Sequence, residues 1–213
     1  MEISVQQMYA IEESGHRMGF LKKFMMENAG AAAVHNLLKS VPDIASKRVL
    51  VLAGMGNNGG DGLVMARHLA GHGADVVVAL MSPQDRPKTE EGRWNLSLLD
   101  RMPSVRMWDG GAPYPDSDVI IDAILGTGIT GDIREPYSSA IRHINDADCF
   151  VMSVDVPSGL NPETGEAASP SVHADVTVTF HRMKHGIPKR PDLTGAVSVE
   201  RIGIPPEAEE GII

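Results

Sequence analysis

Residues 48–62 read RVLVLAGMGNNGGDG, and this stretch decides the fold. Its first part, Arg48–Ala53, is a short and almost wholly apolar run, which is typical of a strand buried on both faces of a sheet. Its second part, Gly54–Gly62, is rich in glycine and precedes a helical pattern. Glycines between a strand and a helix let backbone N–H groups approach a phosphate, and the helix N-terminus favours the anion. The stretch therefore predicts an α/β protein with an anion-binding loop.

Outside this stretch, apolar runs alternate with helical patterns along the whole chain. We expect helices over residues 20–38, 63–72, 93–101 and 138–144, and further strands over 74–81, 104–108, 119–125, 149–154, 175–180 and 196–201. Ser4 and Gln7 have the spacing of a capping box and predict one more helix at the N-terminus. Continuously apolar strands that alternate with helices indicate a doubly wound, mostly parallel sheet. Residues 1–213 fit a single domain.

The composition excludes several classes of protein. The net charge is −9, and an acidic surface repels phosphate backbones, so we expect no nucleic-acid partner. No apolar run reaches the roughly 20 residues that a membrane helix needs, and the first residues lack a secretion signal, so we expect a cytoplasmic protein with no membrane partner. The single cysteine, Cys149, opens an apolar run and is interpreted as a buried strand residue rather than a nucleophile.

Two more predicted strands run into glycines and short polar side chains. The segment from Asp122 reads DAILGTG, and the segment from Asp155 reads DVPSG. Ligands bind outside the carboxyl ends of strands in an open parallel sheet, so the three loops are expected to converge on one crevice. Residues 126–132 are compatible with a phosphate cradle and with a plain connection. Asp155 and Ser158 are compatible with a site and with a simple turn or helix cap.

Several familiar nucleotide and metal sites are not supported. A dinucleotide-binding dehydrogenase needs an acid at the end of the second strand, but the nearest one, Asp75, lies at that strand's start. The chain has no Gly-Lys-Ser/Thr sequence, which excludes a P-loop. No HExxH sequence is present, and His68 and His72, which lie four residues apart on a predicted helix, are interpreted as a partly exposed helix face rather than a metal site.

Four stretches resemble the YjeF N-terminal domain family, the NAD(P)H-hydrate epimerases. They are MENAG (26–30), GNNGGDG (56–62), GTG (126–128) and VDVPSGLN (154–161). The resemblance implies a three-layer Rossmann-like fold with N-terminal helices. It implies interconversion of the R and S epimers of NADHX and NADPHX, which carry water at nicotinamide C6. It also implies a homodimer. Many relatives are fused to an NAD(P)HX dehydratase, and for this chain we expect that dehydratase to be a separate functional partner.

The resemblance also assigns residues to the site. It implies a potassium ion, and the side-chain ligands map to Asn58, Asp122 and Ser158, whose oxygens suit a hard cation. The substrate contacts map to Asn57, Asn58, Gly59, Gly60, Asp61, Gly126, Thr127, Gly128, Ile129, Thr130, Gly131, Asp132 and Asp155.

Asp155 is the candidate catalytic residue. Carbon 6 carries both the hydroxyl and the ring nitrogen, so its inversion proceeds by loss of water or by ring opening. Both routes need a proton transfer at the oxygen, which a carboxyl group can perform. Asp122 is assigned to the cation, and Asp61 is expected to be held ionised by backbone N–H groups at a helix start. Lys184 is a second candidate that either tunes Asp155 or holds a phosphate.

The alternative function is a non-catalytic nucleotide-binding or dimerisation module. Domains of this family also occur as dimerisation and RNA-associated parts of larger proteins. The acidic charge argues against an RNA role, because phosphate backbones are themselves anionic. The joint presence of Asp61, Asp122 and Asp155 argues for a working site.

Overall fold

Seven parallel strands form the central sheet of the protein. The computed structural model describes residues 1–82, 86–110, 113–127 and 132–213. The strand order is β4-β3-β2-β5-β6-β7-β9, and every neighbouring pair is parallel. The strands are β2 (Arg48–Ala53), β3 (Asp75–Leu80), β4 (Val105–Met107), β5 (Val119–Ala123), β6 (Phe150–Val154), β7 (Val176–Phe180) and β9 (Ala196–Glu200). The predicted parallel sheet is confirmed.

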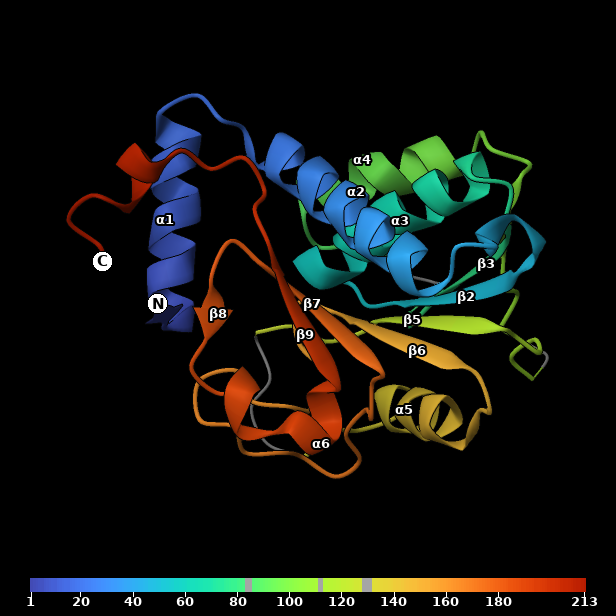
Figure 1. The fold of residues 1–213 in the computed structure, drawn as a ribbon. Coiled ribbons are helices and arrows are strands. Elements are labelled where there is room, and N and C mark those ends of the chain that lie inside the picture. Colours follow the sequence, from blue (N-terminus) through green and yellow to red (C-terminus); the bar gives the residue numbers. More distant parts are fainter. Residues whose placement is uncertain (83–85, 111–112, 128–131) are drawn as a thin grey trace.

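Helices cover both faces of this sheet (Figure 1). Helices α2 (Lys22–Ser40), α3 (Asn57–Gly71) and α4 (Glu90–Leu99) lie on one side, and α5 (Tyr137–Asp146) and the short α6 (Pro191–Thr194) lie on the other. The side chains of β2 alternate between the two layers. Val49 and Val51 pack in the core with α2 and α3, whereas Leu50 and Leu52 pack in the core with α5. Strand β2 is continuously apolar because both of its faces are covered.

Helix α1 (Val5–Arg17) stands at the edge of the molecule, beside the C-terminal segment (Figure 1). The predicted capping box is present: the Gln7 backbone N–H donates to Ser4 Oγ at 3.0 Å, and the Ser4 N–H donates to Gln7 Oε1 at 2.8 Å. Just before the helix, β1 (Glu2–Ile3) pairs in parallel with β8 (Met183–Lys184). The N-terminus and a late turn of the chain therefore hold each other in place.

The glycine-rich stretch departs from the prediction, because α3 begins at Asn57 rather than at residue 63. The helix starts directly at the tip of β2 and packs too closely on it for side chains. A Cβ on Gly59 would lie 1.9 Å from the Gly54 carbonyl oxygen, and a Cβ on Gly62 would lie 2.6 Å from the Ala123 Cβ. Most of these glycines therefore serve close packing of a helix on the sheet rather than a long loop.

The remaining elements are short helical turns that the hydrophobic pattern did not predict. They are η1 (Ile44–Ser46), η2 (Ile187–Lys189) and η3 (Pro206–Glu209).

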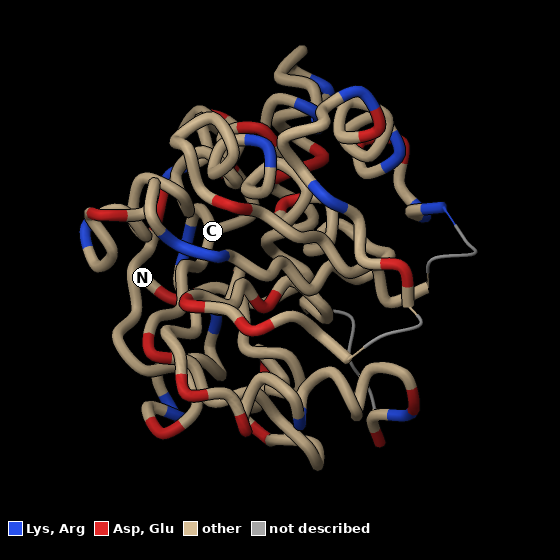
Figure 2. Tube along the Cα trace, turned by 90° about the vertical axis from the view of Figure 1, so that its right-hand side faces the viewer, with Lys and Arg blue, Asp and Glu red and all other residues tan. Residues whose placement is uncertain are grey.

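Acidic and basic residues are interspersed along the trace (Figure 2). Within the described ranges, no helix is long and apolar enough to cross a membrane.

The prediction for Cys149 is wrong in one detail. The residue lies immediately before β6 and is partly exposed rather than buried in the strand. The strand begins one residue later, at Phe150, whose N–H donates to the Asp118 carbonyl. Burial nevertheless raises the pKa of the Cys149 thiol, which disfavours the reactive thiolate.

Candidate active site

The candidate site lies where the strand order reverses, between β2 and β5. From β2 the sheet continues through β3 to β4, and from β5 it continues through β6 and β7 to β9. Such a switch point opens a crevice outside the carboxyl ends of the strands. A pocket of about 260 Å³ is found there, lined by residues of α1, α2 and α3, of the loops after β5 and β6, and of β7 and β8.

The N-terminus of α3 presents backbone donors to this pocket. Its N-cap residue is Gly56, which lines the pocket together with Asn57 and Asn58. The cap has no side-chain hydrogen bond, and the first turn has no acidic residue. No atom lies within 4 Å of a Cβ built on Gly56, so the backbone is open to a ligand. Unsatisfied N–H groups and the helix dipole together favour an anion at this point.

A buried cluster of oxygen atoms joins the three loops. The Asp122 carboxylate, at the end of β5, accepts hydrogen bonds from Ser153 Oγ at 2.7 Å, the Ser158 N–H at 2.8 Å and Ser158 Oγ at 2.5 Å. Asn58 Nδ2 donates to the Leu125 carbonyl at 3.2 Å. Asn58 Oδ1 is buried and has no hydrogen-bond partner among the described residues. Burial raises the pKa of Asp122, and the serine hydrogen bonds oppose that effect.

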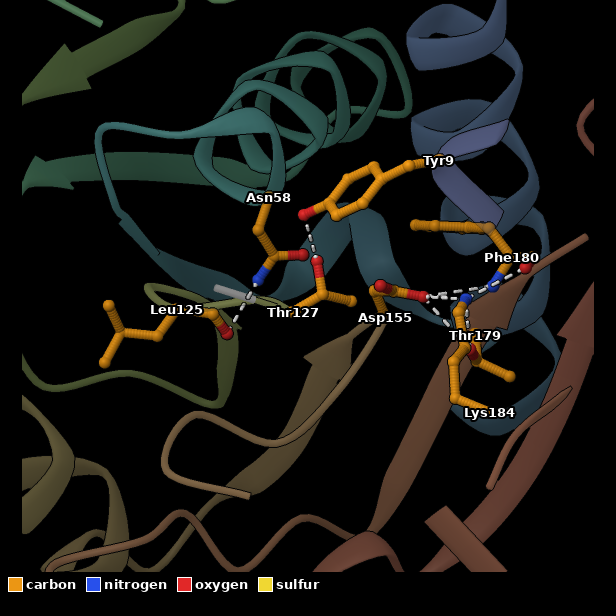
Figure 3. Close-up of polar contacts among 8 residues, drawn as sticks. All are labelled: Tyr9, Asn58, Leu125, Thr127, Asp155, Thr179, Phe180 and Lys184. Atoms are coloured by element: carbon orange, nitrogen blue, oxygen red, sulfur yellow. Dashed lines mark hydrogen bonds and ion pairs between the residues drawn. The ribbon is translucent and has the colours of Figure 1, made fainter. Parts of the chain in front are cut away.

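Asp155 follows β6 at the floor of the pocket, with φ of 62°. This left-handed conformation is uncommon for a residue other than glycine and recurs at functional sites. Asp155 Oδ1 accepts hydrogen bonds from Lys184 Nζ at 2.5 Å, Thr179 Oγ1 at 3.0 Å and the Phe180 N–H at 3.3 Å (Figure 3). The strand end therefore aims a firmly held carboxylate at the pocket.

All three donors of the Lys184 ammonium group are used in contacts around Asp155. It is 1% exposed, and besides Asp155 its ammonium donates to Thr179 Oγ1 at 2.9 Å and to the Phe180 carbonyl at 3.0 Å. An ammonium group has three donors, so these contacts satisfy it. Of the two roles considered for Lys184, these contacts favour the one directed at Asp155 over the binding of a phosphate.

The prediction that Asp61 is held ionised by backbone N–H groups is wrong. Asp61 is the fifth residue of α3, beyond the free N–H groups of the first turn. Its side chain lines the pocket, is only 9% exposed, and has no hydrogen bond from any described residue. Burial, and then the charges of Asp155 and Glu12, raise its pKa well above the ordinary value. Burial and the neighbouring acids therefore disfavour the ionised form of Asp61.

Sequence reasoning missed the contribution of α1. Val5, Met8, Tyr9 and Glu12 recur at helical spacing and all line the pocket. The Tyr9 hydroxyl lies 2.7 Å from Thr127 Oγ1, which connects α1 to the loop after β5 (Figure 3). The spacing was visible in the sequence, but a helical stripe by itself does not say which cavity it faces.

The structure brings some of the predicted contact residues together and separates others. Those that line the pocket are Asn57, Asn58, Asp61, Gly126, Thr127 and Asp155. Gly59 and Gly60 are buried behind it against Gly54 and Met26. Asp132 is exposed and is not among the lining residues. The predicted contacts Gly128, Ile129, Thr130 and Gly131 fall outside the described residues.

A family model described as "YjeF-related protein N-terminus" matches residues 22–186. The chain belongs to the YjeF-related N-terminal family. The match covers the three loops of the pocket and Lys184, and it begins after α1. The family assignment made from the sequence motifs is thereby confirmed.

Relatives within the YjeF-related family span the whole chain. A protein of Nitrosopumilus maritimus named NAD(P)H-hydrate epimerase is 62% identical over 215 residues, which cover all of both chains. A protein of Cenarchaeum symbiosum with the same name is 63% identical, also over the full length of both. The bifunctional NAD(P)H-hydrate repair enzyme Nnr of Methanothermobacter thermautotrophicus is 45% identical, and the match covers 95% of this chain and 40% of that enzyme.

A solved structure supports the fold of this YjeF-related chain. The crystal structure of the yeast protein ynu0 superposes with a TM-score of 0.79 at 27% sequence identity. The superposition covers 94% of this chain and 88% of the yeast chain. The three-layer, Rossmann-like architecture is therefore shared with an experimentally determined relative.

Proposed function

We propose that the protein is an NAD(P)H-hydrate epimerase, an isomerase that interconverts the R and S forms of NADHX and NADPHX at nicotinamide C6. The names of the two full-length relatives support this assignment at 62% and 63% identity. The observation that carries it is the placement of the Asp155–Lys184 pair at the floor of a switch-point pocket, next to the open N-terminus of α3.

One end of the pocket suits the diphosphate of the substrate, and the other end suits its hydrated nicotinamide ring. The N-terminus of α3 and the Gly126–Thr127 segment offer a place for the diphosphate, because backbone donors and a helix dipole favour anions. Asn57, Asn58 and Asp61 line the same wall. The hydrated nicotinamide ring would then lie towards Asp155, between α1 and the sheet.

In this arrangement Asp155 moves the proton at the C6 hydroxyl. Lys184, Thr179 and Phe180 all donate to Oδ1, which fixes the carboxylate and leaves Oδ2 free of hydrogen bonds from described residues. A positioned carboxylate can accept a proton from a hydroxyl or from an attacking water and return it. The ion pair with Lys184 supplies the countercharge that a carboxylate needs in a mostly buried place.

We further propose a potassium ion held by Asn58, Asp122 and Ser158. The buried Asn58 Oδ1 lacks a partner among the described residues, and it lies in a cluster with the Leu125 carbonyl, Ser158 Oγ and the Asp122 carboxylate. This all-oxygen donor set fits a hard cation. When bound, the ion supplies a positive charge beside the phosphate loops and ties the three loops together.

A separate NAD(P)HX dehydratase would consume the product of this reaction. The Methanothermobacter relative is named as bifunctional, and this chain covers only 40% of its length.

We also propose a homodimer in which the N-terminal helices form the interface. Light scattering of the purified protein tests this proposal.

The decisive experiment uses resolved (R)-NADHX and follows its conversion by chromatography. We expect the purified protein to produce the S epimer faster than a protein-free control. We expect no NADH to appear when ATP or ADP is added, because dehydration is assigned to another enzyme. Binding of NADHX without any interconversion would favour the alternative, a non-catalytic nucleotide-binding module of the same fold.

A further inference from the structure

The wall that α1 contributes to the pocket carries one ionisable carboxyl, Glu12. Glu12 lines the pocket beside Tyr9 and Met8, and it makes no hydrogen bond or ion pair with any described residue. The next residue, Glu13, behaves differently: it is half-exposed and pairs with Lys22 Nζ at 2.9 Å. Glu12 therefore lines the cavity with no partner among the described residues.

Charge in the pocket explains the state of this carboxyl. The lining acids are Glu12 on α1, Asp61 on α3, Glu91 on α4 and Asp155 after β6, and the lining cations are Lys22 on α2 and Lys184 on β8. Each lysine already has its own carboxylate, since Lys22 pairs with Glu13 and Lys184 with Asp155. No lining cation is left to pair with Glu12.

The surroundings of Glu12 shift its pKa towards neutral pH. Burial, and then the negative charge of Asp155, raise its pKa from 4.5 to about 7, while Lys184 and Lys22 oppose the rise. Burial also raises the pKa of Asp61, and the charges of Asp155 and Glu12 contribute to that rise. A general acid works best when its pKa lies near the working pH, which describes Glu12.

We propose that Glu12 is a second catalytic residue, the acid that protonates the C6 hydroxyl of the hydrated nicotinamide, while Asp155 serves as the base. This inference rests on the proposed epimerase function. The site then has one carboxylate, neutralised by Lys184, and one carboxyl that carries a transferable proton. Two carboxyl groups in different environments are a recurrent solution for acid and base chemistry in one site.

The proton balance of the reaction closes with these two groups. The C6–O bond breaks with its electron pair going to oxygen, which takes the Glu12 proton and leaves as water. The ring-nitrogen lone pair forms a C=N bond at C6. A water then adds to the opposite face, the C=N electrons return to nitrogen, and the water loses a proton to Asp155. Proton exchange with solvent restores both groups.

The test compares Glu12→Gln with Glu207→Gln, a change at an exposed glutamate that does not line the pocket. Each is assayed for epimerisation of (R)-NADHX across neutral pH, and binding of NADPH is measured separately. We expect wild-type kcat/KM to fall as the pH rises through about 7, since the acid form is required. Glu12→Gln should lower kcat by on the order of 10²-fold or more, bind NADPH normally and lose this alkaline limb. Glu207→Gln should keep both the rate and the limb.

A further variant keeps the assignment falsifiable if glutamine disturbs the helix. Glu12→Asp retains a titrating carboxyl and should recover part of the lost rate. The inference is overturned if Glu12→Gln keeps the wild-type rate and pH profile, or if Asp61→Asn rather than Glu12→Gln removes the alkaline limb. Wild-type protein that fails to interconvert the epimers would instead overturn the proposed function itself, so the two failures are distinguishable.

Discussion

Lys184 Nζ lies 2.5 Å from Asp155 Oδ1, and this contact is set by the N-terminus of the chain. Lys184 belongs to β8, which pairs with β1 so that Lys184 is opposite Ile3. Ile3 is completely buried. The first residues of the protein thus fix the lysine that positions the candidate catalytic carboxylate, although they are distant from it in sequence.

Replacing Lys184 by methionine should destabilise the protein. Lys184→Met leaves Asp155 as a mostly buried carboxylate without its countercharge, and breaking such a pair costs about 3–5 kcal/mol. The double variant Lys184→Met/Asp155→Asn removes both charges and should recover much of this loss. Urea denaturation of the two variants and the wild type measures the difference. Equal stability of the single and double variants would show that the ion pair contributes nothing.

Asp155→Asn should remove turnover while preserving binding. The amide keeps the shape of the side chain but cannot exchange a proton, so turnover should fall by on the order of 10²–10⁴-fold. Asp192→Asn is the matched control, because Asp192 is exposed, pairs with Arg190 and does not line the pocket. Rates on (R)-NADHX and affinities for NADPH are compared. A wild-type rate in Asp155→Asn would reduce Asp155 to a ligand contact.

Potassium should stabilise the protein through Asn58. A site at 100 times its Kd in free potassium would add about 2.7 kcal/mol, so the wild-type Tm should be higher in potassium chloride than in tetramethylammonium chloride. Asn58→Ala removes the unpartnered Oδ1 and should abolish the difference, whereas Asn57→Ala should retain it. Identical Tm values for wild type in the two salts would refute the cation site.

The fold was predictable where local pattern and tertiary packing agree. Strand β2 has the predicted bounds, because both of its faces are covered and its run is apolar throughout. The start of α3 was missed because glycine disfavours helices, yet Gly59 and Gly62 are needed for the close approach to Gly54 and Ala123. Here packing that is invisible in the local sequence overrides helix propensity.

The candidate site was predictable only in part. Asp155 was placed correctly, since the end of a strand followed by Pro157 fixes where it lies. The backbone hydrogen bonds predicted for Asp61 were wrong, because Asp61 lies in the second turn of α3, and its pKa is raised by burial and by acids from other elements. Glu12 was missed because α1 is placed at the pocket by the pairing of the preceding β1 with β8 and by its own contacts with the C-terminal segment.

Two glycines of the same segment should respond differently to alanine. A Cβ on Gly59 would lie 1.9 Å from the Gly54 carbonyl oxygen, so Gly59→Ala forces the backbone apart and should cost about 1–3 kcal/mol or more. Gly56→Ala meets no atom within 4 Å and should change stability by less than about 0.5 kcal/mol. Its methyl group would nevertheless occupy the pocket and weaken NADPH binding. Thermal unfolding and NADPH titration separate the two effects, and equal destabilisation by both changes would contradict this account.

Glu12→Gln should stabilise the ligand-free protein at neutral and alkaline pH. The pKa of Glu12 is raised from 4.5 to about 7 on folding, so the folded protein binds this proton more tightly than the unfolded chain. Wild-type stability should therefore fall as the pH rises from about 4.5 to about 7, by on the order of 3 kcal/mol, whereas glutamine does not ionise. The difference in unfolding free energy between the two proteins isolates Glu12 from carboxyls such as Glu135, whose lowered pKa acts in the opposite direction. A difference that stays constant across this pH range would mean that Glu12 ionises in the folded protein as readily as in the unfolded chain.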